Sequence, residues 1–344
     1  MAARSRIPVV RILAACLCAA LTVLAANAIA ADHPQSTLVP RSDVGWMIQH
    51  LLESIVFWVV VIFIGVEAAL IVTVLRFRRS PDGPAPKQVH GNTTLEVAWT
   101  IAPAIILAFI AVPTVKTIFQ TAAMPPHPGL EVKVVGHQWW WEFQYPGLGV
   151  TTANELHVPV GTTVALSVES ADVIHSFWIP TFSGKRDVIP GRTNHLWFTP
   201  DSTGTFPGQC AEFCGASHAN MHFKVISEPR AAFDAWVAEQ KAPTPPPDST
   251  SLAAKGQAVF QNGLCVACHT IDGVSFGQIG PNLTKVATRG TIAAGMFPND
   301  AEHLANWIRN APAQKPGSIM PGPPTLTLTD EQVRALVAYL QSRR

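Results

Sequence analysis

The sequence predicts a multidomain membrane protein with a two-helix transmembrane hairpin, an all-β domain and a small all-α domain, in that order. Three observations predict it: two long apolar stretches near the start, short Val-, Thr- and Phe-rich runs in the middle, and helical periodicity at the end. The composition agrees, because 48% of the residues are hydrophobic and only 14% are charged. The formal net charge of +1 gives no sign of a basic surface, so we expect no nucleic-acid partner.

Residues 1–30 have the layout of a secretory signal peptide. Three arginines precede an Ala- and Leu-rich stretch that ends at Ala28-Ile29-Ala30, which gives the order of charge, apolar core and small-residue cleavage site. We expect cleavage near Ala30. An uncleaved signal anchor is the alternative, and Cys16 in a lipoprotein-like context makes lipidation a minor alternative.

Residues 31–122 are predicted to form the transmembrane hairpin, with spans at about residues 51–75 and 95–119. Each stretch is dominated by large apolar residues and is long enough for the roughly 20 residues that cross a bilayer. The loop between them carries Arg76, Arg78, Arg79 and Lys87, so the positive-inside rule places it in the cytoplasm. Everything after the second span is therefore expected on the extracytoplasmic side.

Residues 123–241 are predicted to form the all-β domain, as a sandwich or a barrel. Between residues 131 and 226 the sequence consists of short runs rich in Val, Thr, Trp and Phe, broken by turn signals such as Pro146-Gly147 and Pro190-Gly191. Residues 231–241 favour a terminal helix. A Pro-rich segment, residues 242–251, follows and is expected to form a stiff, extended linker.

The last domain, residues 252–344, shows helical periodicity over residues 252–261, 302–310 and 330–342. Thr329 and Asp330 are both candidate caps for the last of these helices. Loops rich in Gly and Pro separate the periodic segments. We therefore expect a small, all-α domain.

One short segment combines several soft metal ligands. Cys210, Cys214, His218 and Met221 lie close together in the sequence, and thiolate, imidazole and thioether groups favour copper over hard cations. A strand that resumes after this segment turns Met221 and its neighbour His222 to opposite faces, so only one of the two should be a ligand.

A second imidazole, His175, is available from an earlier predicted strand. A blue-type copper site needs only one cysteine, so the second thiolate suggests two coppers bridged by both sulfurs. A disulfide is one alternative, and zinc is another that the methionine disfavours.

The segment Cys265-Val266-Ala267-Cys268-His269 has the C-x-x-C-H spacing at which two thiols attach a haem c and the histidine binds its iron. A redox disulfide fits poorly, because no βαβ pattern surrounds the segment. Methionine is the expected sixth ligand of an electron-transfer haem. We expect Met320, which lies in a Pro-flanked loop, to fill this role, and Met296 to be a packing residue.

The copper segment, preceded by the Asp-Val-Ile-His-Ser-Phe of residues 172–177, resembles the binuclear CuA site of cytochrome c oxidase subunit II. The match extends to residues 99–105, 136–141 and 184–192, and so covers about residues 46–226. The resemblance implies a cupredoxin-like domain in which two coppers share both thiolates. The implied ligands are Cys210 and Cys214 as bridges, His175 and Met221 for one copper, and His218 and the backbone carbonyl of Glu212 for the other.

The same resemblance gives three further residues a role. It implies that the side chain of Glu212 points towards a magnesium site shared with the catalytic subunit. It places the exposed tryptophan through which electrons enter at Trp139, although on a strand core packing is as good an explanation for each ring of residues 139–141. It also makes Glu96, otherwise an interfacial charge, the residue at the mouth of a proton-uptake pathway.

The last domain resembles a class I cytochrome c, and the whole chain resembles subunit II of a caa-type haem-copper oxidase. This implies that electrons pass from a donor to haem c, then to CuA, then to catalytic subunit I, which reduces oxygen to water coupled to proton translocation. The expected partners are subunit I, the other oxidase subunits, and a cytochrome c or quinol-oxidising complex as donor. The expected location is the bacterial inner membrane, with both redox domains in the periplasm.

The alternative function is electron transfer to a CuA-containing nitric oxide reductase or another membrane reductase. Two spans favour docking to a large membrane partner over a free carrier, which needs only one anchor. The chain by itself lacks the many-span, multi-histidine framework of an oxygen-reducing site.

Overall fold

The structure is a computed structural model that describes residues 36–77 and 88–344. The described residues form two compact units, one of residues 46–123 and one of residues 36–45 together with 124–344. The predicted signal peptide and the loop residues Arg78, Arg79 and Lys87 lie outside the described residues.

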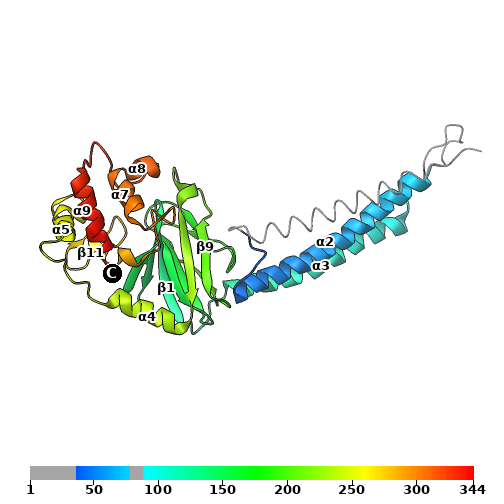
Figure 1. Ribbon diagram of the computed structural model, residues 1–344. Coiled ribbons are helices and arrows are strands. Elements are labelled where there is room, and N and C mark those ends of the chain that lie inside the picture. The colour runs from blue at the N-terminus through cyan, green and yellow to red at the C-terminus, as the bar shows by residue number, and fades with distance from the viewer. Residues whose placement is uncertain (1–35, 78–87) are drawn as a thin grey trace, which may run out of the picture. The chain divides into compact units, whose positions relative to one another are not determined.

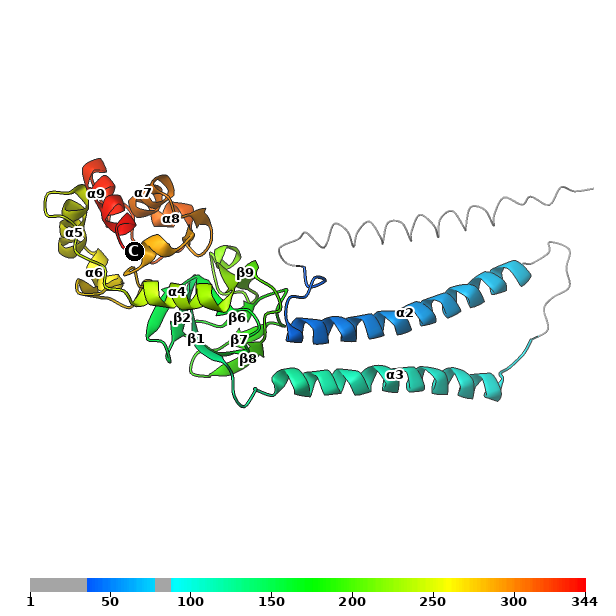
Figure 2. The same cartoon turned by 60° about the horizontal axis from the view of Figure 1, so that its bottom comes forward.

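Two long helices, α2 (Asp43–Arg76) and α3 (Thr93–Ala122), make up the smaller unit and run side by side (Figures 1 and 2). The rings of Trp58 and Phe109 stack between them, with centroids 5.6 Å apart. Both helices are long and apolar enough to cross a membrane, and their apolar stretches are not buried by protein. The two predicted spans are confirmed, but the helices are longer than the apolar stretches because polar turns continue them at the ends.

Two five-stranded sheets form the β domain. One has the strand order β3-β2-β1-β5-β8 and the other β4-β10-β9-β6-β7. The pairs β1/β5 and β4/β10 are parallel and the other neighbours are antiparallel. The strands are β1 (Leu130–His137), β2 (Trp140–Tyr145), β3 (Val150–Ala153), β4 (Glu155–Pro159), β5 (Val164–Ser170), β6 (His175–Trp178), β7 (Arg186–Val188), β8 (Asn194–Phe198), β9 (Gly204–Cys210) and β10 (His222–Glu228).

The core of this domain lies between the sheets, because burial alternates along the strands, as in β1 and β10. Trp141, Phe143, Phe177 and Phe223 are fully or almost fully buried there. Gly208 lies opposite Phe223, and a Cβ at this position would meet the ring at 2.1 Å, so only glycine fits. Helix α4 (Arg230–Lys241) closes the domain by burying Phe233 and Trp236.

The C-terminal domain is helical, as predicted, and its helices are α5 (Leu252–Asn262), α6 (Cys265–Cys268), α7 (Ala301–Arg309), α8 (Ala311–Gln314) and α9 (Asp330–Gln341). Thr329 rather than Asp330 caps α9, in a capping box with Gln332. Helices α5 and α9 cross closely at Gly256 (Figure 1).

The helical class of this domain is confirmed, and two short ladders also lie between its helices. They are β11 (Thr270–Ile271) with β12 (Ser275–Phe276), and β13 (Thr291–Ile292) with β14 (Phe297–Pro298). Two short 3-10 turns, η1 (His218–Asn220) and η2 (Val286–Thr288), complete the elements of the described chain. Strands of two residues are too short to leave a periodicity in the sequence.

Candidate functional site

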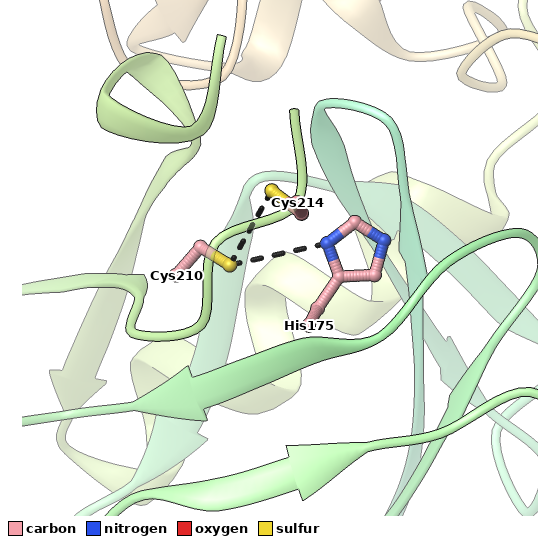
Figure 3. Close-up of side chains that lie close together, drawn as sticks. All are labelled: His175, Cys210 and Cys214. Carbon is pink, nitrogen blue, oxygen red and sulfur yellow. Dashed lines mark hydrogen bonds between the residues drawn. The ribbon is translucent and has the colours of Figure 1, made fainter. Parts of the chain in front are cut away.

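The end of strand β9 brings the predicted metal ligands together. Strands β6 and β9 pair with Phe177 opposite Cys210, so His175 on β6 lies next to the cysteine loop. Cys210 Sγ is 3.9 Å from His175 Nδ1 and 3.8 Å from Cys214 Sγ, and all three residues are buried (Figure 3). A disulfide joins sulfurs at about 2.05 Å. Both cysteines are therefore free thiols, and the ligand atoms of the three residues lie within 4.8 Å of one another.

The remaining predicted ligands lie close to one of the two sulfurs, His218 and Met221 to Cys214 and the Glu212 carbonyl to Cys210. Cys214 Sγ is 3.6 Å from His218 Nδ1 and 3.8 Å from Met221 Sδ. The carbonyl oxygen of Glu212 is 3.3 Å from Cys210 Sγ. Met221 is fully buried, whereas His222 is half-buried. The donor set consists of two thiols, two imidazoles, one thioether and one carbonyl, which suits copper.

A carboxylate orients His175. Asp172 Oδ1 lies 2.8 Å from His175 Nε2, which leaves Nδ1 facing Cys210. Burial opposes ionisation of Asp172, but hydrogen bonds from His175 and from the backbone N–H of Val173 and Gln138 hold its pKa below the ordinary value. The hydrogen bond from Cys214 lowers the pKa of Cys210, which favours the thiolate form that binds metals.

A cavity of about 400 Å³ surrounds the C-x-x-C-H segment, a volume in the range of cofactor sites. Cys265, Cys268, His269 and Met320 line it, whereas Met296 is not among its lining residues. The rest of the lining includes apolar side chains that suit a haem: Leu283, Ile292, Leu304, Ile308 and Leu340.

The predicted haem ligand His269 is held in one orientation. His269 Nδ1 lies 2.8 Å from the carbonyl oxygen of Pro281, which leaves Nε2 free for a metal. Burial lowers the pKa of His269, so the imidazole is neutral and its lone pair is available. A Cβ at Gly280 would meet the imidazole at 2.6 Å, so this glycine lets the ring lie against the backbone. Gly280 and Pro281 have no separate signal in the sequence, and their roles appear only in the fold.

Trp139 connects the cavity with the cysteine loop. It lines the cavity, and its indole Nε1 donates to the carbonyl oxygen of Cys214 at 3.0 Å. Gln138 Nε2 donates to the same oxygen at 2.7 Å. Two expectations for Trp139 are wrong: it lies in the turn between β1 and β2 rather than on a strand, and it is only 8% exposed because the C-terminal domain covers it.

Two charged residues that sequence reasoning missed lie where the β domain meets the C-terminal domain. Lys315 Nζ donates to the carbonyl oxygens of Trp139, Asn220 and Ala293. The Glu155 carboxylate accepts from the backbone of the 290–291 segment. No local spacing points to either residue, because the partners are far apart in the sequence.

Two predicted residues remain: Glu96 on α3, and the side chain of Glu212 in the cysteine loop. Glu96 is in the first turn of α3, where its Oε1 accepts from the backbone N–H of the N-cap Asn92 at 3.2 Å. Asn92 Oδ1 in turn accepts from the N–H of Leu95. Glu96 therefore has a capping role whatever else it does. The side chain of Glu212 is exposed, in contrast to its neighbours Cys210 and Cys214.

Three family descriptions match the chain in the order of its parts. They are "Cytochrome C oxidase subunit II, transmembrane domain" over residues 42–117, "Cytochrome C oxidase subunit II, periplasmic domain" over residues 149–228, and "Cytochrome c" over residues 253–344.

Relatives match over most of their length. Cytochrome c oxidase subunit 2 of Alkalihalophilus pseudofirmus is 40% identical over 303 residues, which are 86% of this chain and 87% of the relative. Cytochrome c oxidase subunit 2 of Bacillus sp. (strain PS3) is 38% identical over 284 residues, 78% of this chain and 79% of the relative. A crystal structure of the periplasmic domain of subunit II of cytochrome oxidase of Bradyrhizobium japonicum is 36% identical, with a TM-score of 0.34, and covers 34% of this chain and 97% of that chain.

Proposed function

The chain belongs to the cytochrome c oxidase subunit II family, and we propose that its haem and copper sites act in series. Electrons then pass from an outside donor to haem c, from haem c to CuA, and from CuA to catalytic subunit I. As a subunit II with a cytochrome c domain, it is the subunit through which electrons enter an oxidase that reduces oxygen to water and translocates protons. It is a membrane protein with two spans and an extracytoplasmic domain. The bacterial inner membrane is its proposed location.

One observation supports the series arrangement above all others: Trp139 lines the haem cavity and donates a hydrogen bond to the backbone of the copper ligand Cys214. One side chain thus contacts both sites. When bound, haem c and the copper pair supply centres that each take up one electron at a time. Trp139 then holds the two sites at a fixed spacing through a single aromatic ring.

We propose the ligand set that the resemblance implies. Cys210 and Cys214 would hold both coppers; His175 and Met221 would complete one copper site, and His218 with the Glu212 carbonyl would complete the other. The short distances from the Cys210 and Cys214 sulfurs to the four other donors support this set. In the haem domain Cys265 and Cys268 attach the haem, and His269 and Met320 are its axial ligands, as their common cavity supports.

Rapid mixing of the purified oxidase complex with a reduced donor tests the series. The haem c absorption should change first, the near-infrared absorption of CuA second and the haems of subunit I last, with oxygen uptake following. The proposal would be contradicted if CuA were reduced before haem c. It would also be contradicted if the purified complex contained no oxygen-consuming subunit with catalytic haems. The donor is proposed to be a cytochrome c or a quinol-oxidising complex, and trials with each as the only reductant separate the two.

Trp139→Phe tests the proposed role of the tryptophan. The substitution keeps an aromatic ring in the cavity wall but removes the hydrogen bond to the Cys214 carbonyl. Transfer from haem c to copper should slow by about tenfold or more, while the reduction of haem c by the donor stays unchanged. Trp197→Phe, in the same domain but on strand β8, is the matched control. An equal effect of both substitutions would mean that Trp139 has only a packing role.

Met320→Leu tests the haem ligand, with Met296→Leu as its control in the same domain. Loss of a thioether ligand should remove the absorption band of methionine-bound ferric haem and lower the reduction potential, because methionine raises it. Met296→Leu should change neither. The proposal fails if Met296→Leu removes the band instead.

Glu96 is proposed to take up protons for subunit I, and Glu212 to contribute to a magnesium site shared with that subunit. Glu96→Gln keeps an oxygen that can accept from the Asn92 N–H, so the cap of α3 is preserved. Turnover of the intact complex should fall while copper reduction stays normal; unchanged turnover would refute the role. Glu212→Gln should lower the magnesium content of the complex without changing its copper content.

A further inference from the structure

We propose that the haem domain is fixed on the copper domain by a built interface, with Lys315 and Glu155 as its two positioning residues. Electrons then cross between surfaces that are already docked, and the haem domain does not swing on its linker between reduction and delivery. This inference rests on the proposed series of haem c and copper. It adds the domain interface that sets the position of the haem site relative to the copper site.

Lys315 reaches from the haem domain into the backbone of the copper domain. It is 4% exposed, and its Nζ donates to the carbonyl oxygens of Trp139 at 2.7 Å, Asn220 at 2.9 Å and Ala293 at 3.0 Å. An ammonium group has three donors, so all of them are used. The first two acceptors belong to the copper domain and adjoin the proposed path: Trp139 itself, and the residue that precedes Met221.

Glu155 makes the reciprocal contact from the copper domain. It is 3% exposed, and its Oε1 accepts from Thr291 N and Thr291 Oγ1, each at 3.0 Å, while Oε2 accepts from Gly290 N at 3.2 Å. Each domain therefore contributes one charged side chain that forms hydrogen bonds with backbone groups of the other domain. A buried charge is costly unless every partner is in place, so the pair specifies one docked position.

The surfaces between these two contacts fit closely. Gly317 has φ +81°, and a Cβ there would lie 2.5 Å from Cη2 of Trp139, so the loop backbone lies directly on the indole. Ser217 Oγ, beside the copper ligand His218, donates to the carbonyl oxygen of Pro316 at 2.6 Å. Trp140 and Ala153 of the copper domain and Ala294 of the haem domain form one small buried apolar cluster.

Two consequences follow for the electron donor. Trp139 is covered by the chain's own haem domain, so a separate protein has no access to it. An outside donor must therefore reduce haem c, and the step from haem c to copper should be independent of collisions. Domains of one chain often move relative to one another, whereas here the haem domain stays docked on the copper domain.

The test uses the whole oxidase complex, in which haem c is reduced by a light-activated ruthenium compound and CuA is followed in the near infrared. The wild-type transfer rate should not change when sucrose raises the viscosity. Lys315→Met keeps most of the side-chain volume but removes all three donors; transfer should slow at least tenfold and become viscosity-dependent. Lys255→Met is the control, because Lys255 lies in the same domain with a 65% exposed side chain.

Hydrogen exchange supplies a second readout that depends on neither metal nor turnover. The amides of Gly290 and Thr291 should exchange faster by about tenfold or more in both Lys315→Met and Glu155→Gln, because undocking exposes them to water. The amides of α9 and the haem spectrum should stay unchanged, which shows that the haem domain is still folded. Lys255→Met should leave the exchange as it is.

A wild-type transfer rate that falls with viscosity would overturn the fixed interface. So would Lys315→Met and Glu155→Gln variants whose transfer rate and exchange match those of the wild type. If photoreduced haem c never reduces copper in the wild type, the series of sites fails instead, and the exchange of Gly290 and Thr291 still decides whether the domains are docked.

Discussion

Gly256→Ala should destabilise the haem domain, against the direction that helix propensity predicts. A Cβ at Gly256 would lie 1.9 Å from the carbonyl oxygen of Ala335 and 2.8 Å from Cβ of Tyr339. Real Cβ atoms essentially never approach closer than 3.0 Å, so α5 and α9 would have to move apart by about 1.1 Å. Phe260 and Tyr339, both almost fully buried at this crossing, would lose their packing.

The two opposing effects differ in size. Alanine gains about 1 kcal/mol over glycine in a helix interior. Overpacking costs about 1–3 kcal/mol, and the upper end applies because the obstacle is backbone and cannot rotate away. The net loss of about 2 kcal/mol corresponds to a fall in melting temperature of about 8–16 °C for a domain of this size.

Thermal unfolding of the full chain in detergent, followed by circular dichroism in the Soret band, measures this transition. Gly147→Ala is the control, because a Cβ at that position meets nothing within 4 Å and the residue is in the copper domain. A melting temperature for Gly256→Ala equal to or above that of the wild type would show that the helices adjust freely and that the steric reasoning is wrong.

Three further predictions concern other parts of the larger unit. Cys214→Ser should abolish the bound copper and its near-infrared absorption while the haem content stays normal; metal analysis of the purified chain checks this, and retained copper would contradict the ligand set. Tyr145→Phe should cost about 1–3 kcal/mol in the free energy of unfolding, measured by denaturant titration, because the buried hydroxyl both donates to the carbonyl and accepts from the N–H of His157. Hydrogen bonds from His303 lower the pKa of Asp300, the cap of α7, below its ordinary 3.8. The stability that Asp300 contributes is thus present above pH about 4 and is lost as the pH falls through the lowered pKa, so Asp300→Asn should flatten the acid side of the stability profile; an identical acid profile would refute this.

The elements that the sequence predicted well are those with a local signal. The two spans follow from apolar length, and the sandwich follows from short β-rich runs between turn residues. The metal site is predicted from the spacing of Cys210, Cys214, His218 and Met221, because these residue types are metal ligands whatever the fold around them. His175 is distant from the cysteine loop in the sequence, and the pairing of β6 with β9 brings it to Cys210.

The features that escaped prediction depend on contacts between distant segments. Lys315 and Trp139 are 176 positions apart, and Glu155 and Thr291 are 136 apart, so no window of sequence contains either pair. Trp139 is expected to be exposed because the resemblance that gives it a role concerns the copper domain. Its burial depends on the second domain, and family resemblance gives no information about how two domains of one chain meet.

The two free sulfurs of the copper site also set a condition on assembly. Cys210 Sγ and Cys214 Sγ lie 3.8 Å apart and a disulfide needs about 2.05 Å, so after a small movement of the loop an oxidant could join the two thiols in a disulfide. The domain matures outside the cytoplasm, where oxidation of close thiols is favoured. Copper binding and disulfide formation therefore compete for the same two sulfurs, and the site accepts metal only while both are reduced.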